Sequence, residues 1–346
     1  MKKYLWLFLA ALCSYIFYFF SLPPSTPYTP PPLPVQEELL LVPLDSRPPC
    51  TLMAQDLGRL ASIDVILPPK ELLDNYRTPA NREKLSSWLS HNAGKCPAVI
   101  SGDLLIHGGL LASRLPQGTV NDEQNFFKLL QAIPSGEDIT VFSIIPRLLV
   151  SDNLLPDAWY QWHLMRYSTL RDIVEQFGDY PSTAQLEEIK NKIPQEILQK
   201  YNVLYSTNDS FNKQLAALCA AKNYTLVIGQ DDAQPFGLPN RNRTHAEAYM
   251  RRAGLRCAST TTCGADEIAQ MLTARRFCQI NNYKPKFYIE YTTSSATTAI
   301  MPYMAVTAEA ALVDKIKFTS GTLTQSLDEA DVILYVHCGS AKEPAN

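Results

Sequence analysis

The sequence lacks the short motifs that mark the commonest nucleotide and metal sites. It has no Cys-x-x-Cys pair, no phosphate-binding loop and no Ser-His-Asp order, and Gly102 to Gly109 do not have dinucleotide-fingerprint spacing. It has no stripe of basic residues either, since 31 Lys and Arg stand against 34 Asp and Glu. We therefore expect no nucleic-acid partner and no structural zinc site, and the sequence identifies no cofactor.

The cysteines form no regular framework. Seven lie beyond residue 22, at irregular spacings: Cys50, Cys96, Cys219, Cys257, Cys263, Cys278 and Cys338. Cys257 and Cys263 are close enough in sequence to predict one disulfide if the chain lies in an oxidising compartment. Buried free thiols explain the others equally well.

A long uncharged stretch occupies the start of the chain. Tyr4 to Leu22 carries no charge and would span about 28 Å as a helix, close to the hydrocarbon thickness of a bilayer. Lys2 and Lys3 precede it and no basic residue follows before Arg47, which predicts a cytoplasmic N-terminus. A cleaved secretory signal is the alternative, but no Ala-x-Ala site follows the apolar core. We expect a single-pass membrane anchor with an extracytoplasmic domain.

A proline-rich segment separates this stretch from the rest. Seven prolines fall between Leu22 and Gln36, and such a segment is extended, reaching up to roughly 45 Å. The predicted organisation is an anchor over residues 1–22, a spacer over 23–38 and an α/β domain over 39–346.

The domain alternates apolar runs with helical patterns. The expected strands are Leu39–Leu44, Ile63–Leu67, Ala98–Ser101, Ile139–Ile145, Leu226–Ile228, Lys286–Tyr291 and Val332–His337. The expected helices are Asn81–His91, Asp122–Ile133, Tyr160–Gln176, Ser210–Ala221 and Ala265–Gln279. Continuous apolar strands are typical of a mainly parallel sheet buried on both faces. The pattern fits a doubly wound sheet or an incomplete (β/α)8-type barrel, with a helical insertion or cap over residues 148–201.

Polar residues follow several of these strands. They are Asp45 with Arg47, Asp103 with His107 and Arg114, Arg147, and Gln230 with Asp231 and Asp232. Because the carboxyl ends of parallel strands share one edge, we expect these groups to converge on one crevice. Each has a structural alternative: a local Asp45–Arg47 ion pair, a helix cap at Asp103, a turn at His107, a tight turn at Gly108-Gly109, and a surface ion pair at Arg147.

The adjacent acids Asp231 and Asp232 are the strongest single signal. Two neighbouring carboxylates repel, which raises one pKa unless a cation or hydrogen bonds compensate. That arrangement suits general acid–base chemistry or a divalent cation, with helix capping as the alternative. Asp266 and Glu267, by contrast, are expected to cap a helix.

Taken in order, these segments resemble a bacterial family catalogued as Domain of Unknown Function 4127. The matching strings are Val42-Pro43-Leu44-Asp45-Ser46-Arg47-Pro48, Pro68-Pro69, the run from Ser101 to Arg114, Pro146-Arg147, Gly229-Gln230-Asp231-Asp232 with Pro235 and Gly237, and Gly264-Ala265-Asp266-Glu267. The resemblance covers roughly Leu39 to His337 and rests on several rare strings in a fixed order.

Two positions depart from that family, which has Asn where Cys50 stands and Tyr where His107 stands. The resemblance also implies a further strand and a Gly-Trp-Asn-Thr motif after His337. The chain stops at Asn346, which predicts a shortened sheet.

The leading functional hypothesis is a hydrolase acting on a carbohydrate-like or cell-wall substrate. Asp231 or Asp232 would face Asp103 across the scissile bond as the paired carboxylates. The remaining candidates would bind substrate: Asp45, Arg47, His107, Arg114, Arg147 and Gln230. Two alternatives stay open, a non-catalytic module that binds a polar or glycan ligand, and an inactive shortened product.

Overall fold

A computed structural model describes residues 34–114, 120–136, 138–149, 159–178, 180–255 and 258–338. The chain divides into two compact units, Met1–Pro34 and Val35–Asn346, and the described fold belongs to the second. The expected anchor Tyr4–Leu22 and nearly all of the proline-rich spacer lie outside the described ranges. Within those ranges no helix is both long and apolar enough to cross a bilayer.

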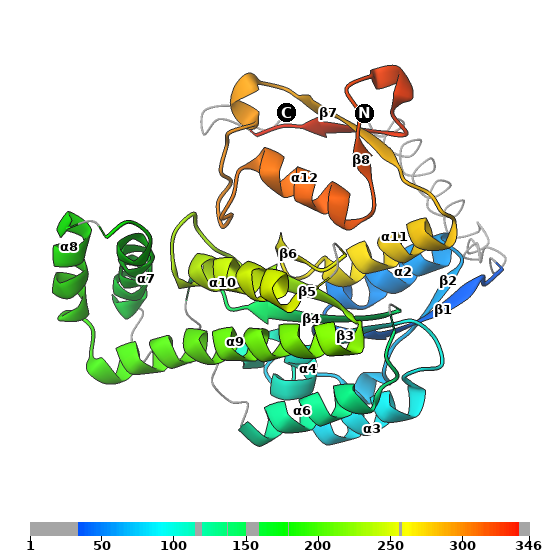
Figure 1. The fold of residues 1–346 in the computed structure, drawn as a ribbon, viewed down its shortest axis with the longest axis horizontal. Coiled ribbons are helices and arrows are strands. Elements are labelled where there is room, and N and C mark those ends of the chain that lie inside the picture. Colours follow the sequence, from blue (N-terminus) through cyan, green and yellow to red (C-terminus); the bar gives the residue numbers. More distant parts are fainter. Residues whose placement is uncertain are drawn as a thin grey trace, which may run out of the picture. The chain divides into compact units, whose positions relative to one another are not determined.

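Six parallel strands form the main sheet (Figure 1). They are β1 (Glu37–Val42), β2 (Ile63–Ile66), β3 (Ala98–Ser101), β4 (Ile139–Ile145), β5 (Thr225–Gln230) and β6 (Thr260–Cys263). Their order is β2-β1-β3-β4-β5-β6, and every neighbouring pair is parallel. The sheet is open and doubly wound, with the strand order reversing between β1 and β3. The barrel alternative is therefore wrong.

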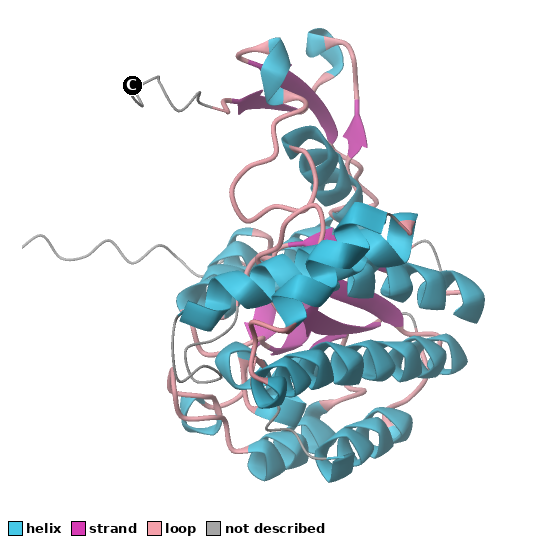
Figure 2. Cartoon of the chain, turned by 90° about the vertical axis from the view of Figure 1, so that its left-hand side faces the viewer, coloured by secondary structure: helices cyan, strands magenta, loops and turns pink. Residues whose placement is uncertain are grey.

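Helices cover both faces of this sheet, which appears as a layer between helices in Figure 2. Packed on one face are α3 (Arg82–Asn92), α4 (Gly102–His107), α6 (Val120–Ala132), α9 (Gln195–Lys222) and α10 (Leu238–Ala253); on the other lie α2 (Leu52–Leu60) and α11 (Ile268–Ile280). Strand β4 shows why its sequence is a continuous apolar run. Val141 and Ile145 join the first core, whereas Phe142 and Ile144 join the second, because successive side chains point to opposite faces.

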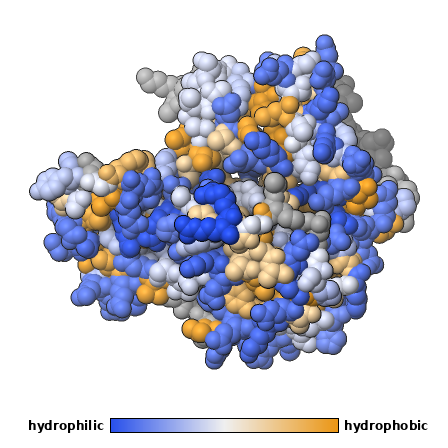
Figure 3. Space-filling model, in the orientation of Figure 1, coloured by the Kyte–Doolittle hydropathy of each residue, from blue (hydrophilic) through white to orange (hydrophobic). Residues whose placement is uncertain are grey.

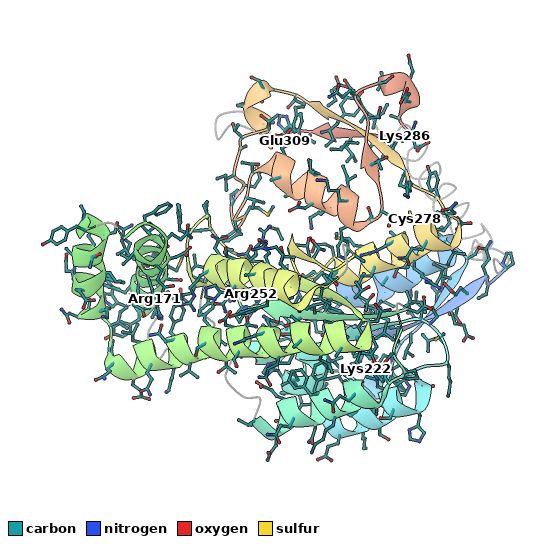
Figure 4. All side chains as sticks on the ribbon, viewed as in Figure 1. Arg171, Lys222, Arg252, Cys278, Lys286 and Glu309 are labelled. Carbon is teal, nitrogen blue, oxygen red and sulfur yellow. The ribbon has the colours of Figure 1, made fainter. Side chains whose placement is uncertain are left out.

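A helical cap follows β4. It consists of α7 (Trp159–Phe177), α8 (Tyr180–Lys190) and the first half of α9, around a separate apolar cluster that includes Leu164, Tyr201 and Leu238. Helix α9 is longer than the expected Ser210–Ala221 and continues from the cap along the sheet. At its carboxyl end Lys222 donates to the backbone oxygen of Gln131 in α6, 2.9 Å away (Figure 4).

The last strands form a second, smaller sheet. Strands β7 (Lys286–Tyr291), β8 (Thr322–Leu323) and β9 (Val332–Val336) are parallel in the order β8-β7-β9, and α12 (Ala308–Phe318) packs with them. Lys315 of α12 donates to the Cys263 carbonyl, 2.9 Å away, and pairs with Glu267. Large hydrophobic side chains such as Ile333 and Tyr335 are exposed here, whereas hydrophilic residues gather over α10 (Figure 3).

The remaining elements are short: α5 (Leu110–Ser113), and the 3-10 helices η1 (Pro48–Cys50), η2 (Lys70–Leu72), η4 (Ser294–Ala296) and η5 (Leu327–Glu329). Two strands, β6 and β8, were not expected from the sequence. Strand β6 is Thr-Thr-Thr-Cys, which has the β-branched shape of a strand residue but no apolar run to reveal it.

The predicted Cys257–Cys263 disulfide involves a residue that the structure does not describe. Cys263 is a buried free thiol whose sulfur accepts from Arg243 at 3.2 Å, while Cys257 lies outside the described residues. Burial also raises the pKa of the Cys263 thiol, with Arg243 and Lys315 opposing that shift.

Candidate functional site

The carboxyl edge of the main sheet brings together side chains from five strands. The loops after β1, β3, β4, β5 and β6 all leave the sheet at this edge, and the order reverses between β1 and β3. Open α/β sheets bind ligands at such a reversal. The predicted residues divide into two ionic clusters and one buried group below them.

The first cluster is centred on Arg47. Its Nε donates to Asp45 Oδ2 at 2.8 Å, and its two terminal nitrogens donate to the Asp266 carboxylate at 2.6 and 3.0 Å. Burial acts to lower the pKa of Arg47, but the two carboxylates outweigh it and the pKa lies above its ordinary value. The expected local Asp45–Arg47 pair is confirmed, and the same guanidinium also joins the loop after β1 to the loop after β6.

Asp74 supports this cluster from the loop after β2. Its Oδ1 accepts the Ser46 backbone N–H at 2.6 Å. Burial raises the pKa of Asp74, and the hydrogen bond from Ser46 opposes that shift. The turn from Asp45 to Arg47 is therefore held by the Asp45–Arg47 contacts and by the hydrogen bond to Asp74.

The second cluster pairs Arg114 with Asp231. Arg114 follows α5, and its Nη2 and Nε both donate to Asp231 Oδ2, at 2.5 and 3.1 Å. The two side chains are only 11% and 10% exposed. The other oxygen of Asp231 accepts the Asp232 backbone N–H at 2.9 Å. Both carboxylate oxygens of Asp231 are therefore engaged.

Asp232 has a different environment from its neighbour. Burial raises its pKa, the negative charge of Asp231 adds to the shift, and Arg147 and Arg114 oppose it. Asp266 also contributes to raising this pKa, so Asp232 lies within electrostatic reach of the first cluster. Asp232 is only partly buried. The two adjacent acids thus differ as the sequence indicated, one in an ion pair and one holding its proton to higher pH.

Asp103 lies deeper, under the ends of β3 and β4. It is 5% exposed, and its Oδ2 accepts the Ile144 backbone N–H at 2.8 Å. Burial raises its pKa to about 7, with the Ile144 and Ser113 hydrogen bonds opposing that rise. It does not cap α4, because Ser101 is the N-cap and its Oγ accepts the Leu104 N–H at 3.3 Å. The capping alternative for Asp103 is wrong.

His107 ends α4 on the same side of the sheet. Burial and the charge of Arg82 lower its pKa to about 4, and the charge of Asp122 opposes them. The turn that follows accounts for Gly108: its φ is +87°, and a Cβ there would lie 2.6 Å from Pro79. The tight-turn explanation of these glycines is confirmed.

Arg147 follows the end of β4, and Gln230 is the last residue of β5. The Arg147 carbonyl accepts a hydrogen bond from the Tyr205 hydroxyl at 2.7 Å. The positive charge of the Arg147 side chain acts to lower the pKa of Asp232. Gln230 is 2% exposed, and its Oε1 accepts from Arg243 of α10 at 3.4 Å. Since Gln230 and Asp231 are adjacent on an extended strand end, their side chains face opposite ways.

Asp266 is the residue that sequence reasoning missed. It was expected to cap the helix that follows, but α11 begins at Ile268 with no side-chain cap from Glu267. Asp266 binds Arg47 and Glu267 binds Lys315 instead. Its position directly after a strand would have been visible had β6 been recognised.

The described part of the chain contains no group of three or more His, Cys, Asp or Glu side chains arranged to hold a metal ion. Asp231 and Asp232 themselves are balanced by Arg114 and Arg147. The cation alternative for these acids therefore has no supporting ligand set among the described residues.

The fold and its edge define an α/β protein with a doubly wound parallel sheet and a carboxylate- and arginine-rich strand edge. The chain belongs to the family described as protein of unknown function (DUF4127), whose model matches residues 39–345. Comparison with curated proteins and with solved structures finds no match.

Proposed function

We propose that the chain is a hydrolase that cleaves a carbohydrate-like or cell-wall substrate at the carboxyl edge of the main sheet. The observation that supports it most is the raised pKa of Asp232, a partly buried acid whose pKa is raised by burial and by the charges of Asp231 and Asp266. A general acid requires a carboxyl whose pKa is raised above its ordinary value.

Asp232 is assigned as the proton donor to the leaving oxygen of the scissile bond. Asp266 is the opposing carboxylate, because it is 42% exposed and is held in place by Arg47. An ionised carboxylate there stabilises the positive charge that develops on the sugar ring as the bond breaks. Water then completes the hydrolysis.

Asp231 and Asp103 are assigned supporting roles beside this pair. Asp231 has both oxygens engaged by Arg114 and the Asp232 N–H, so it fixes the backbone that carries Asp232. Asp103 holds the Ile144 N–H at the end of β4. Arg147 remains the candidate for orienting substrate oxygens, since its charge already acts on Asp232.

The substrate class follows from the polarity of the edge and from the expected anchor. The side chains identified at the strand ends are carboxylates, guanidinium groups and an amide, which suit a hydroxyl-rich ligand. A membrane anchor over Tyr4–Leu22 would hold the domain outside the cell, near cell-wall polymers. Membrane attachment and a glycan partner are both parts of this proposal.

The test is release of new reducing ends. The purified full-length chain is incubated with a panel of oligosaccharides and cell-wall fragments, beside Asp232→Asn and the exposed control Asp328→Asn. We expect turnover by the wild type and the control, and a loss of roughly 100-fold or more in Asp232→Asn. Binding of a fragment without turnover by the wild type would instead favour the non-catalytic binding module.

A further inference from the structure

A pocket of about 280 Å³ lies on the α4 side of the sheet, under the ends of β3 and β4. Its walls come from α4, α6, α9 and the end of β4. The residues that carry its chemistry are Asp103, His107, Ser113, Glu123, Thr207 and Asn208. This volume is near the lower end of the range for small-molecule sites, roughly 300–1,000 Å³. Arg47 and Arg114, the arginines of the two ionic clusters, are not among the residues that line this pocket.

The polar lining combines acidic groups with neutral ones that both donate and accept hydrogen bonds. Two carboxyls and an imidazole face the pocket, and no Lys or Arg is among its lining residues. Arg82, whose charge acts on His107, is paired with Asp122 at 2.8 Å and donates to the Ile106 carbonyl at 2.9 Å. An anion would find no counter-charge here, whereas a cation would find two.

One polar atom in the wall has no partner. The Nδ1 atom of His107 is buried and makes no hydrogen bond within the described residues. A buried polar atom left without a partner costs free energy, and a bound ligand that donates to it removes that cost. Glu123 likewise has no ion-pair partner in the described part of the chain, and burial raises its pKa.

The rest of the wall is apolar. The pocket is lined by Ile106, Leu204 and Phe211. All three residues are buried. The exposed Val120 and Val203 also belong to the lining, with 71% and 42% of their surface accessible. Such walls would cover an alkyl or aryl group of the ligand.

We propose that this pocket binds the ammonium group of a small organic amine, with the amine's apolar body against Phe211 and its N–H bonds directed to Asp103, Glu123 and His107. The site is separate from Asp232 and is independent of any hydrolase activity.

Binding should be linked to protonation of Asp103. Its carboxyl has a pKa of about 7, so an ammonium group placed beside it would favour the ionised form and expel a proton. The charged groups around it are His107 and Glu123 in the pocket, the Arg82–Asp122 pair behind α4, and the Arg114–Asp231 pair above. Asp103 has a pKa of about 7, so we expect its proton to be the one displaced.

The experiment is calorimetric titration of the full-length chain with three matched probes. These are 2-phenylethylammonium, its neutral isostere 2-phenylethanol and the anionic 3-phenylpropanoate. We expect the ammonium probe to bind roughly tenfold or more tightly than either isostere. At about pH 6, where Asp103 is mostly protonated, titrations in buffers of different ionisation enthalpy should show proton release on binding.

Two variants and one control test the assignment. Glu123→Gln and Asp103→Asn should each weaken the ammonium probe by roughly tenfold or more, and Asp103→Asn should abolish the proton release. Glu71→Gln, on an exposed turn, should change nothing. If Asp103→Asn does not fold, Glu123→Gln decides alone. Equal binding of the three probes, no binding by the wild type, or unchanged affinity in Glu123→Gln would overturn the proposal.

Discussion

Arg114 and Asp231 form an ion pair that is almost fully removed from solvent, with 2.5 Å between Nη2 and Oδ2. The two residues are 117 positions apart in the chain and connect the segment after β3 to the end of β5 across the intervening strand β4. This pair fixes the loop that carries Asp232, so the chemistry proposed for Asp232 depends on it.

Removing one partner of this pair should be costly. Arg114→Met leaves Asp231 buried without a counter-charge, and we expect the free energy of unfolding to fall by roughly 3–5 kcal/mol. Urea denaturation measures it. Arg59→Met, which breaks the exposed pair with Asp56, is the control and should cost about 0–1 kcal/mol. Equal losses in the two variants would show that the buried pair is not a special determinant of this edge.

The Arg47–Asp266 contact should couple two distant loops. A double-mutant cycle of Arg47→Lys and Asp266→Asn is expected to give a coupling of about 1 kcal/mol, because Lys cannot reproduce the two parallel hydrogen bonds. The same cycle on Arg59 and Asp56, three residues apart on an exposed helix, should give about 0.5 kcal/mol or less. A coupling near zero for Arg47 and Asp266 contradicts the joining of β1 to β6.

The raised pKa of Asp103 should make the free energy of unfolding fall as pH rises. Its pKa is raised from 3.8 to about 7 by burial, so the folded state binds the proton more tightly than the unfolded state does. The stabilisation is present in full below the unfolded pKa and is lost as pH rises through the folded pKa. Between those limits the loss is at most about 1.4 kcal/mol per pH unit.

Asp103→Asn tests this sign, because the amide mimics the protonated acid and its oxygen still accepts from Ile144. The stability of the wild type relative to this variant should decline steadily from about pH 4 to about pH 7. His107, whose pKa is lowered to about 4, acts in the opposite direction but equally in both proteins. Parallel stability curves for the two proteins would refute the raised pKa.

The start of α10 is capped from another helix, and this too is testable. Ser168 Oγ accepts the Leu238 N–H at 2.7 Å and Asp172 Oδ2 accepts the Gly237 N–H at 2.8 Å. Ser168→Ala should cost about 1–2 kcal/mol and speed hydrogen exchange in the first turn of α10. Ser87→Ala, on the exposed face of α3, should change stability by less than about 0.5 kcal/mol. Unchanged exchange at Leu238 would rule out the cap.

Apolar content explains which parts of the fold were visible in the sequence. Strands β3, β4 and β7 were predicted with their observed bounds, because each is rich in β-branched, aromatic or other apolar residues. Strand β6 was missed since threonine carries a polar hydroxyl, although its β-branched shape fits a strand. The division into two sheets was not predicted, because the sequence of a strand does not reveal which other strand it forms hydrogen bonds with.

The sequence indicated where the residues of the candidate site lie along the chain, but not which residues form ion pairs with each other. Asp45 and Asp231 were placed correctly after the ends of β1 and β5 from the order of elements, and Arg114 follows α5 in the segment after β3. That Arg47 would bind Asp266, 219 positions away, depends on the position of β6, which the sequence did not reveal. The burial that raises the pKa of Asp232 is a property of the loops after β4 and β5 together, and no single segment encodes it.

The most direct test of the central claim compares leaving groups in the Asp232→Asn variant. A general acid is needed for a poor leaving group such as a sugar hydroxyl, but not for dinitrophenolate, which departs without protonation. The account predicts that Asp232→Asn loses reducing-end release from unactivated oligosaccharides while keeping most of the wild-type rate on the matching dinitrophenyl glycoside. Equal loss on both substrates, or wild-type activity on the unactivated one, would contradict the assignment of Asp232 as the acid.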